Sequence, residues 1–199
     1  MEGQLTRTIA SEFSAALGVL QSMAGDPAIA TTMERAVALC VEALGAGRKL
    51  LFAGNGGSAA DAQHWAGELV SRFHYDRPGL AGIALTTDSS ILTAIGNDYG
   101  YERVFARQVE ALGQPGDVLV AISTSGRSPN ILAAIDVART RGLRVVGFTG
   151  AAGTDMAAAC DLCFQVPSER TPRIQEGHEF LGHLLCQLIE AQLFPRHGG

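Results

Sequence analysis

The stretch DVLVAISTSGRSPN, residues 117–130, decides the fold, because it joins a buried strand to a helix through a polar loop. Its apolar run, residues 117–122, is typical of a short strand that is buried on both faces. Pro129 suits the first turn of a helix, where a backbone N–H is not needed. A strand, a loop and a helix in this order form the repeating unit of a parallel sheet with helical crossovers.

The same order recurs on both sides of this stretch. Other short apolar runs, each closed by small or polar residues, predict buried strands at 49–53, 82–85, 143–148 and 161–166. Segments with helical spacing lie at 58–73, 89–95, 102–112, 130–141, 154–159 and 174–194. We therefore expect an α/β fold with a doubly wound, five-stranded parallel sheet flanked by helices. Ligands of such sheets bind beyond the carboxyl ends of the strands.

Two helices are expected before the sheet, at residues 5–23 and 29–44, with a Gly-Asp-Pro breaker between them. A chain of this length can bury one substantial core, and no polar linker divides it. We expect a single domain over residues 1–199, with the opening helices in 1–46 and the sheet core and last helix in 47–199.

Composition excludes several classes of partner. The chain has 199 residues and a formal net charge of −5, and its basic residues are scattered, so we expect no nucleic-acid partner. No stretch is long and apolar enough to cross a bilayer, and the start of the chain lacks a signal-peptide pattern, so we expect no membrane partner and a cytoplasmic location. Cys40, Cys160, Cys163 and Cys186 are too few for a disulfide framework. They are expected to be reduced thiols in buried packing.

The loop at residues 123–128 reads Ser-Thr-Ser-Gly-Arg-Ser and follows directly on a predicted strand. Its hydroxyls, a permissive glycine and the helix start after it offer several donors to an anion. An ordinary helix cap is the alternative, but a cap needs only one hydroxyl. The loop therefore predicts a phosphate monoester as part of the ligand.

Asn55-Gly56-Gly57-Ser58 stands at the equivalent place after the first strand. It lacks the third glycine of a dinucleotide-binding loop and the lysine of a Walker loop, which disfavours both ligands. Adjacent glycines let backbone approach a ligand, and Asn55 can hydrogen-bond hydroxyl groups. Gly-Gly turns are common, so this loop alone is a weak signal.

Two predicted helices carry polar side chains at helical spacing. Asp61, His64, Glu68 and Arg72 follow one another along one face of the first helix after the opening pair, and a solvated face with surface ion pairs is the alternative. In the last helix, Gln175, Glu179 and His183 form a second polar stripe. The near-motif His178-Glu179 with His183 is one residue too long for a zincin site.

The two stripes together offer a set of metal ligands. His64, Glu68, Gln175 and His183 supply nitrogen and oxygen donors that are compatible with zinc without identifying it.

Four segments make a family resemblance specific. NGGSAADAQH at 55–64, TAIGND at 93–98, STSG at 123–126 and RIQEGH at 173–178 resemble signatures of the phosphoheptose isomerases, within the sugar isomerase (SIS) domain superfamily. The resemblance covers nearly the whole chain, including the opening helices. It implies a homotetramer that meets through those helices, with one zinc per subunit. It also implies conversion of sedoheptulose 7-phosphate into D-glycero-D-manno-heptose 7-phosphate, the first step of nucleotide-activated heptose biosynthesis.

The resemblance also implies roles for individual residues. It places zinc on His64, Glu68, Gln175 and His183. It implies substrate contacts from Asn55, Gly56, Gly57, Glu68, Asn97, Asp98, Ser123, Thr124, Ser125, Ser128 and Gln175. Some relatives have an acid where this chain has Pro172, so any role of that acid does not carry over.

The mechanism that we expect is an aldose to ketose isomerisation through an enediol. Glu68 would remove the proton from the carbon next to the carbonyl, and His183 would move protons between the oxygens. Asp61 and Asp98 are secondary alternatives, for ring opening or for orienting His64. One rival hypothesis is a non-catalytic SIS protein that binds the bacterial replication initiator. Another is the sugar-phosphate-sensing module of a transcriptional regulator.

Overall fold

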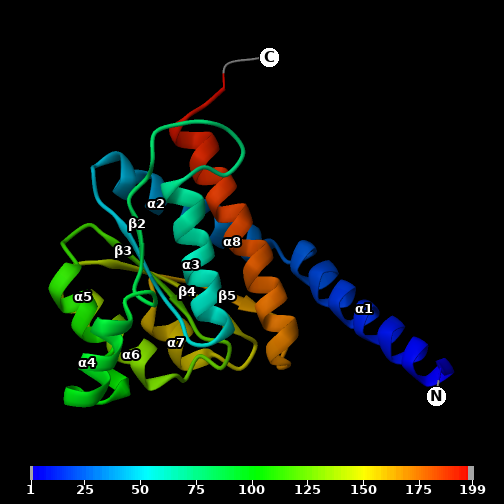
Figure 1. The fold of residues 1–199 in the computed structure, drawn as a ribbon. Helices are drawn as coiled ribbons and strands as arrows, with labels where there is room; N and C mark the ends of the chain where they lie inside the picture. The colour runs from blue at the N-terminus through cyan, green and yellow to red at the C-terminus, as the bar shows by residue number, and fades with distance from the viewer. Residues whose placement is uncertain (1, 197–199) are drawn as a thin grey trace.

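Five parallel strands form one sheet at the centre of the molecule (Figure 1). The computed structural model describes residues 2–196. The strands are β1 (Leu50–Ala53), β2 (Gly82–Ala84), β3 (Val118–Ile122), β4 (Arg144–Gly150) and β5 (Leu162–Val166). Their order in the sheet is β2-β1-β3-β4-β5, and every neighbouring pair is parallel. The expected doubly wound α/β fold is confirmed.

Helices cover both faces of the sheet. They are α1 (Glu2–Ala24), α2 (Pro27–Gly45), α3 (Gly57–Val70), α4 (Ser89–Tyr99), α5 (Ala106–Leu112), α6 (Pro129–Thr140), α7 (Thr154–Ala159) and α8 (Thr171–Leu193), with a 3₁₀ turn η1 at Tyr101–Arg103. Side chains alternate along each strand, so Leu50 and Phe52 pack with α2, α3 and α8 on one face. Leu51 and Ala53 pack with α5, α6 and α7 on the other.

The strand order reverses between β1 and β3, because the chain leaves β1 towards β2 and returns to β3 on the opposite side. Parallel sheets bind ligands at such a switch point. The loops that follow β1 and β3 are those of Asn55 and Ser123, so both polar loops predicted from the sequence meet there. Ala53 at the end of β1 pairs with Ala121 near the end of β3, so the carboxyl ends of the two strands lie side by side.

Three of the differences from the predicted helix boundaries concern residues of the predicted site or their neighbours. The third helix ends at Val70, so Arg72 lies beyond it, exposed, and does not continue the polar stripe. The fourth helix runs on to Tyr99 and includes Asn97 and Asp98 in its last turn. The last helix begins at Thr171, because Pro172 fits its first turn.

Helix α1 extends away from the sheet layers (Figure 1). The middle of α1 is tied to the start of α8 by Arg170, which donates to both carboxylate oxygens of Glu12 at 2.9 Å, and by Arg173, which donates to the Glu12 carbonyl at 2.8 Å. Within residues 2–196 no helix has the length and apolar character that crossing a bilayer requires.

Candidate functional site

The hydroxyl loop after β3 folds into a compact turn. Ser123 is buried at the end of the strand, and its Oγ lies 2.9 Å from Ser128 Oγ. Ser125 Oγ accepts the N–H of Arg127 at 3.2 Å. Gly126 has a φ of +65°, and a side chain there would collide with Gly153 and Thr149, so only glycine fits.

A cavity of about 410 Å³ opens beside this loop. Its lining comprises Thr124, Ser125, Arg127, Ala152, Ser168, Glu169, Thr171 and Ile174. The cavity therefore lies between the hydroxyl loop and the start of α8, where the first N–H groups of the helix have no intrahelical partner. Hydroxyls, an arginine and a helix N-terminus suit a phosphate group.

The loop after β1 is fixed by two residues that the sequence analysis did not identify. Asn55 and Asn130 exchange two side-chain hydrogen bonds, at 3.0 and 2.9 Å, and Tyr101 donates its hydroxyl to Asn55 Oδ1 at 3.1 Å. Asn130 is buried in the first turn of α6, so it joins the two polar loops across the switch point. A buried asparagine directly after the hydroxyl loop is the signal that could have revealed it.

Helices α3 and α8 lie side by side and bring the two polar stripes together (Figure 1). Nε2 of His64 and Nε2 of His183 are 2.7 Å apart. Glu179 Oε1 lies 3.2 Å from the first of these atoms and 3.1 Å from the second. Glu68 Oε1 lies 3.5 Å from His64 Nε2. These four side chains, called the histidine cluster below, are partly exposed and accessible from outside.

The cluster depends on close approach of the two helices. A side chain at Gly182 would collide with the Trp65 ring, so glycine is required where α8 crosses α3. Trp65 is fully buried and packs against Phe148, with ring centroids 4.9 Å apart. Its Nε1 donates to Glu179 Oε2 at 3.1 Å, which leaves Oε1 turned to the histidines.

Asp61 lies one turn before His64, beside the histidine cluster. Its Oδ2 is buried and has no hydrogen-bond partner among the described residues. Burial raises the pKa of Asp61, and the negative charge of Glu179 raises it further, to about 6, although His64 acts in the opposite direction. A carboxyl whose pKa is raised in this way beside an imidazole and a second carboxylate is a feature of functional sites.

Gln175 stands between the phosphate cavity and the histidine cluster. Its amide lies against Gly57 at the start of α3, where a side chain would displace it. Gln175 precedes His183 by two helical turns, about 12 Å along α8. The structure thus places the predicted ligand His183 with Glu179, while Gln175 lies nearer the polar loops. Glu179, a member of the second polar stripe outside the predicted ligand set, is thus the carboxylate that contacts both histidines.

Other predicted residues lie apart from the cluster. Asn97 and Asp98 are exposed at the end of α4, and Asn97 donates to Asp98 Oδ1 at 2.7 Å. Helix α4 lies on the opposite side of the molecule from α8 (Figure 1). Cys160 and Cys163 are free thiols that pack against Gly147 of β4.

Comparisons with known proteins agree in one family. A SIS domain profile matches residues 18–150. The phosphoheptose isomerase of Burkholderia pseudomallei (strain 1710b) is 54% identical over 196 residues, which cover 98% of this chain and 100% of that protein. The phosphoheptose isomerase of Aneurinibacillus thermoaerophilus is 51% identical, covering 94% of each chain. A solved phosphoheptose isomerase from Neisseria gonorrhoeae superimposes with a TM-score of 0.88 at 43% identity, covering 94% of this chain and 99% of that one.

Proposed function

Because the chain belongs to the SIS domain family and, within it, to the phosphoheptose isomerases, we propose that it converts sedoheptulose 7-phosphate into D-glycero-D-manno-heptose 7-phosphate. One observation carries this proposal. The histidine cluster unites His64 and Glu68 of α3 with Glu179 and His183 of α8. An aldose–ketose isomerase needs a base for carbon and a proton carrier for oxygen, and this cluster contains both kinds of group.

In the reaction, Glu68 takes the proton from the carbon next to the carbonyl, which leaves an enediol. Glu68 then returns the proton to the neighbouring carbon, while His183 moves protons between the two oxygens. Both side chains are partly exposed, so a substrate can reach them. Ser123, Thr124, Ser125 and Ser128 hold the phosphate.

Zinc fits the donors of the histidine cluster. Two imidazole nitrogens and a carboxylate oxygen lie within 4.8 Å of one another, a combination that zinc accepts. We assign His64 and Glu179 to the metal as its permanent ligands, with His183, Gln175 and Glu68 as the further ligands that the family resemblance implies; Glu68 and His183 carry protons only when they are not bound to the metal. The chemistry that zinc supplies when bound is polarisation of the carbonyl and stabilisation of negative charge on the enediolate oxygens.

Glu179 removes a difficulty in the expected mechanism. Glu68 cannot be a tight ligand and a free base simultaneously. Glu179 Oε1 is close to both histidine nitrogens, whereas the only contact of this kind that Glu68 makes among the described residues is with His64, at 3.5 Å. Glu179 can therefore serve as the standing carboxylate ligand, which leaves Glu68 available for proton transfer.

The test is direct. Purified protein, loaded with zinc, is incubated with sedoheptulose 7-phosphate, and the anomeric protons of the aldose product are followed by NMR. Appearance of the heptose 7-phosphate supports the proposal. Binding without turnover would instead favour a non-catalytic SIS protein, such as one that binds the replication initiator or senses a sugar phosphate.

We also propose that the protein is a homotetramer, with one domain over residues 1–199 and a cytoplasmic location. Helix α1 exposes an apolar stripe in which each member follows the last by one turn: Leu5, Ile9, Phe13 and Leu17. A groove of about 540 Å³ with a largely apolar lining runs between α1, α2 and α8. A monomer would leave both exposed to water. Light scattering measures the mass, and Phe13→Glu should reduce it.

A further inference from the structure

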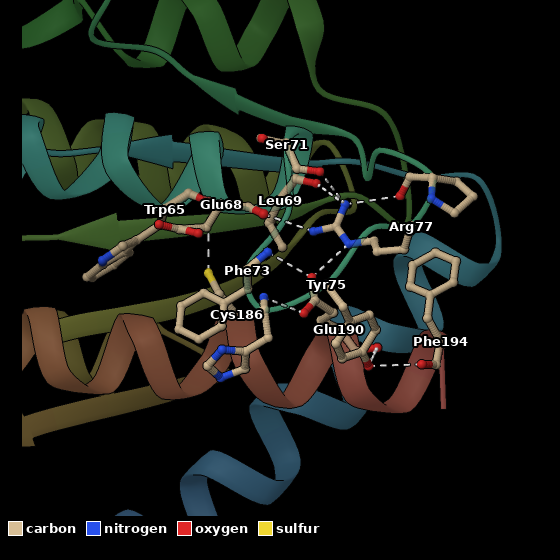
Figure 2. Close-up of polar contacts among 12 residues, drawn as sticks. Trp65, Glu68, Leu69, Ser71, Phe73, Tyr75, Arg77, Cys186, Glu190 and Phe194 are labelled. Atoms are coloured by element: carbon tan, nitrogen blue, oxygen red, sulfur yellow. Dashed lines mark hydrogen bonds and ion pairs between the residues drawn. The ribbon is translucent and has the colours of Figure 1, made fainter. Parts of the chain in front are cut away.

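A buried ion pair holds the loop between α3 and β2, residues 71–81, against α8 (Figure 2). Arg77 donates through Nε to Glu190 Oε2 at 3.0 Å, and the two side chains are only 2% and 1% exposed. Glu190 also accepts the N–H of Phe73 at 2.8 Å and that of His74 at 2.7 Å. Both carboxylate oxygens are thus occupied. This network is called the anchor below.

The other side of the Arg77 guanidinium holds the end of α3. Nη2 donates to the carbonyl of Glu68 at 2.9 Å, and Nη1 donates to that of Leu69 at 2.6 Å. The last carbonyls of a helix have no intrahelical partner, and they form the negative end of the helix dipole. The Arg77 guanidinium donates hydrogen bonds to these carbonyls, and its positive charge stabilises the negative end of the dipole. The position of Glu68 along α3 is therefore tied to Arg77.

The loop also reaches the second catalytic side chain. The Phe73 ring meets the His183 ring edge-on, with centroids 5.7 Å apart and planes at 62°. The N–H of the same Phe73 is held by Glu190, which follows His183 by two turns on α8. The Arg77–Glu190 ion pair thus holds the backbone of Glu68 through Arg77, and it holds the Phe73 ring that packs against His183 through Glu190.

We propose that Arg77 and Glu190 are positioning residues of the isomerase site, which orient Glu68 and His183 through the end of α3 and the Phe73 ring. The inference rests on the roles proposed above for Glu68 and His183. A buried charged network tolerates few arrangements, because displacement of any member leaves a charge or a polar group unpaired. The side chains of the histidine cluster are partly exposed, so their orientation has to be fixed by the buried residues around them.

Three variants separate positioning from simple stabilisation. Glu190→Gln keeps the shape of the side chain and removes its charge. Phe73→Leu leaves the anchor in place and removes the ring that faces His183. Asp117→Asn is the matched control: Asp117 is fully buried and accepts the N–H of Lys49 at 3.1 Å, that of Gln114 at 2.8 Å and the Lys49 ammonium at 2.6 Å. Like Glu190, it is a buried carboxylate that accepts two backbone N–H groups and pairs with a basic side chain. Its partners are Lys49 and Gln114, which have no contact with the histidine cluster among the described residues.

Two readouts are measured for each folded variant: kcat and KM for sedoheptulose 7-phosphate, and the ring NMR signals of His183 in the metal-free protein, assigned with His183→Gln. We expect Glu190→Gln and Phe73→Leu to lower kcat about ten- to a hundredfold, with KM changed no more than about twofold. Both should shift the His183 signals. Asp117→Asn should lower the melting temperature and leave both readouts unchanged.

The proposal is overturned if Glu190→Gln retains kcat within about twofold and unshifted His183 signals, as the control does. If Glu190→Gln does not fold, Arg77→Lys decides by the same criteria, since lysine keeps the positive charge but cannot make all the hydrogen bonds that the guanidinium donates to Glu190 and to the carbonyls of Glu68 and Leu69. A wild-type protein without isomerase activity would refute the proposed function, and the His183 signals would still test the positioning.

Discussion

Two polar clusters of opposite character lie along the paired helices α3 and α8: the histidine cluster on the helices themselves, and the anchor between α8 and the loop 71–81. In the anchor, the Glu190 oxygens and the Arg77 guanidinium are buried, and the Glu190 charge is matched. In the histidine cluster, the side chains are partly exposed and two imidazole nitrogens face each other, and beside it the buried Asp61 Oδ2 has no partner among the described residues. A network in which every polar group is paired stabilises the fold, whereas imidazole nitrogens and carboxylate oxygens that crowd together are typical of a ligand-binding site.

Glu68 belongs to both clusters, and this explains how they are connected. Its carboxylate faces His64 and its carbonyl accepts from Arg77. The Glu68 carboxylate is therefore partly exposed, while the Glu68 backbone is fixed by a hydrogen bond from Arg77. Substitutions that affect only one of the two clusters test whether the histidine cluster carries the chemistry and the anchor the positioning.

The largest effect is expected for Glu68→Gln, which removes the base and leaves the carbonyl that the anchor holds. The value of kcat should fall about 10²- to 10⁴-fold, because the amide of glutamine cannot accept the proton that the carboxylate takes. The melting temperature should stay close to that of the wild type. Product NMR and circular dichroism provide the two measurements. A rate within tenfold of the wild type would remove Glu68 from the mechanism.

Gly182→Ala should separate the helices that carry both clusters. The new methyl group collides with the Trp65 ring, so we expect a loss of about 2 kcal/mol in the free energy of unfolding. Urea denaturation measures it. Gly67→Ala on α3 is the control, since a methyl group there meets no atom within 4 Å. That change should stabilise the protein slightly through helix propensity. Equal losses for the two variants would contradict the packing argument.

Trp65→Phe should weaken the histidine cluster and spare the anchor. The variant loses the N–H that holds Glu179 Oε2 but keeps an aromatic ring in the core. Zinc affinity, measured by competition with a chelator, should fall about tenfold, as is typical when a group that orients a ligand is removed. Phe105→Leu, in the core on the opposite face of the sheet, provides a control for lost aromatic volume. Unchanged zinc affinity in Trp65→Phe would exclude Glu179 from the metal set.

The smallest effect is expected in the pH dependence of the stability that the anchor contributes to the folded state. Burial alone raises the pKa of Glu190, but hydrogen bonds from the backbone of Phe73 and His74 and from Arg77 outweigh it and lower the pKa below 4.5. A lowered pKa stabilises the folded state above the unfolded value, and that stability is lost as the pH falls through the folded value. The stability difference between wild type and Glu190→Gln should therefore shrink below about pH 4.5. Urea denaturation between pH 7 and pH 3 provides the measurement, and a difference that grows with acidity would contradict it.

Much of the fold could be read from the sequence because its signals are local. Strand 117–122 and the loop after it were placed by a run of apolar residues followed by hydroxyls, and the structure has a strand at Val118–Ile122. Helix ends were less accurate, as Arg72 shows, because a polar stripe can continue in sequence after the helix has ended. Asn130 was missed because its partner, Asn55, is 75 residues away.

The sequence by itself determined the alternation of strands and helices, the two polar loops and the spacing that aligns His64 with Glu68 and Glu179 with His183, since each of these depends on backbone period alone. Only the tertiary structure decided that Glu179 meets both histidines and that Arg77 meets Glu190 across 113 residues. Those contacts depend on how closely α8 packs on α3. That distance is set by side-chain volume at the helix crossing, and no periodic pattern in the sequence records it.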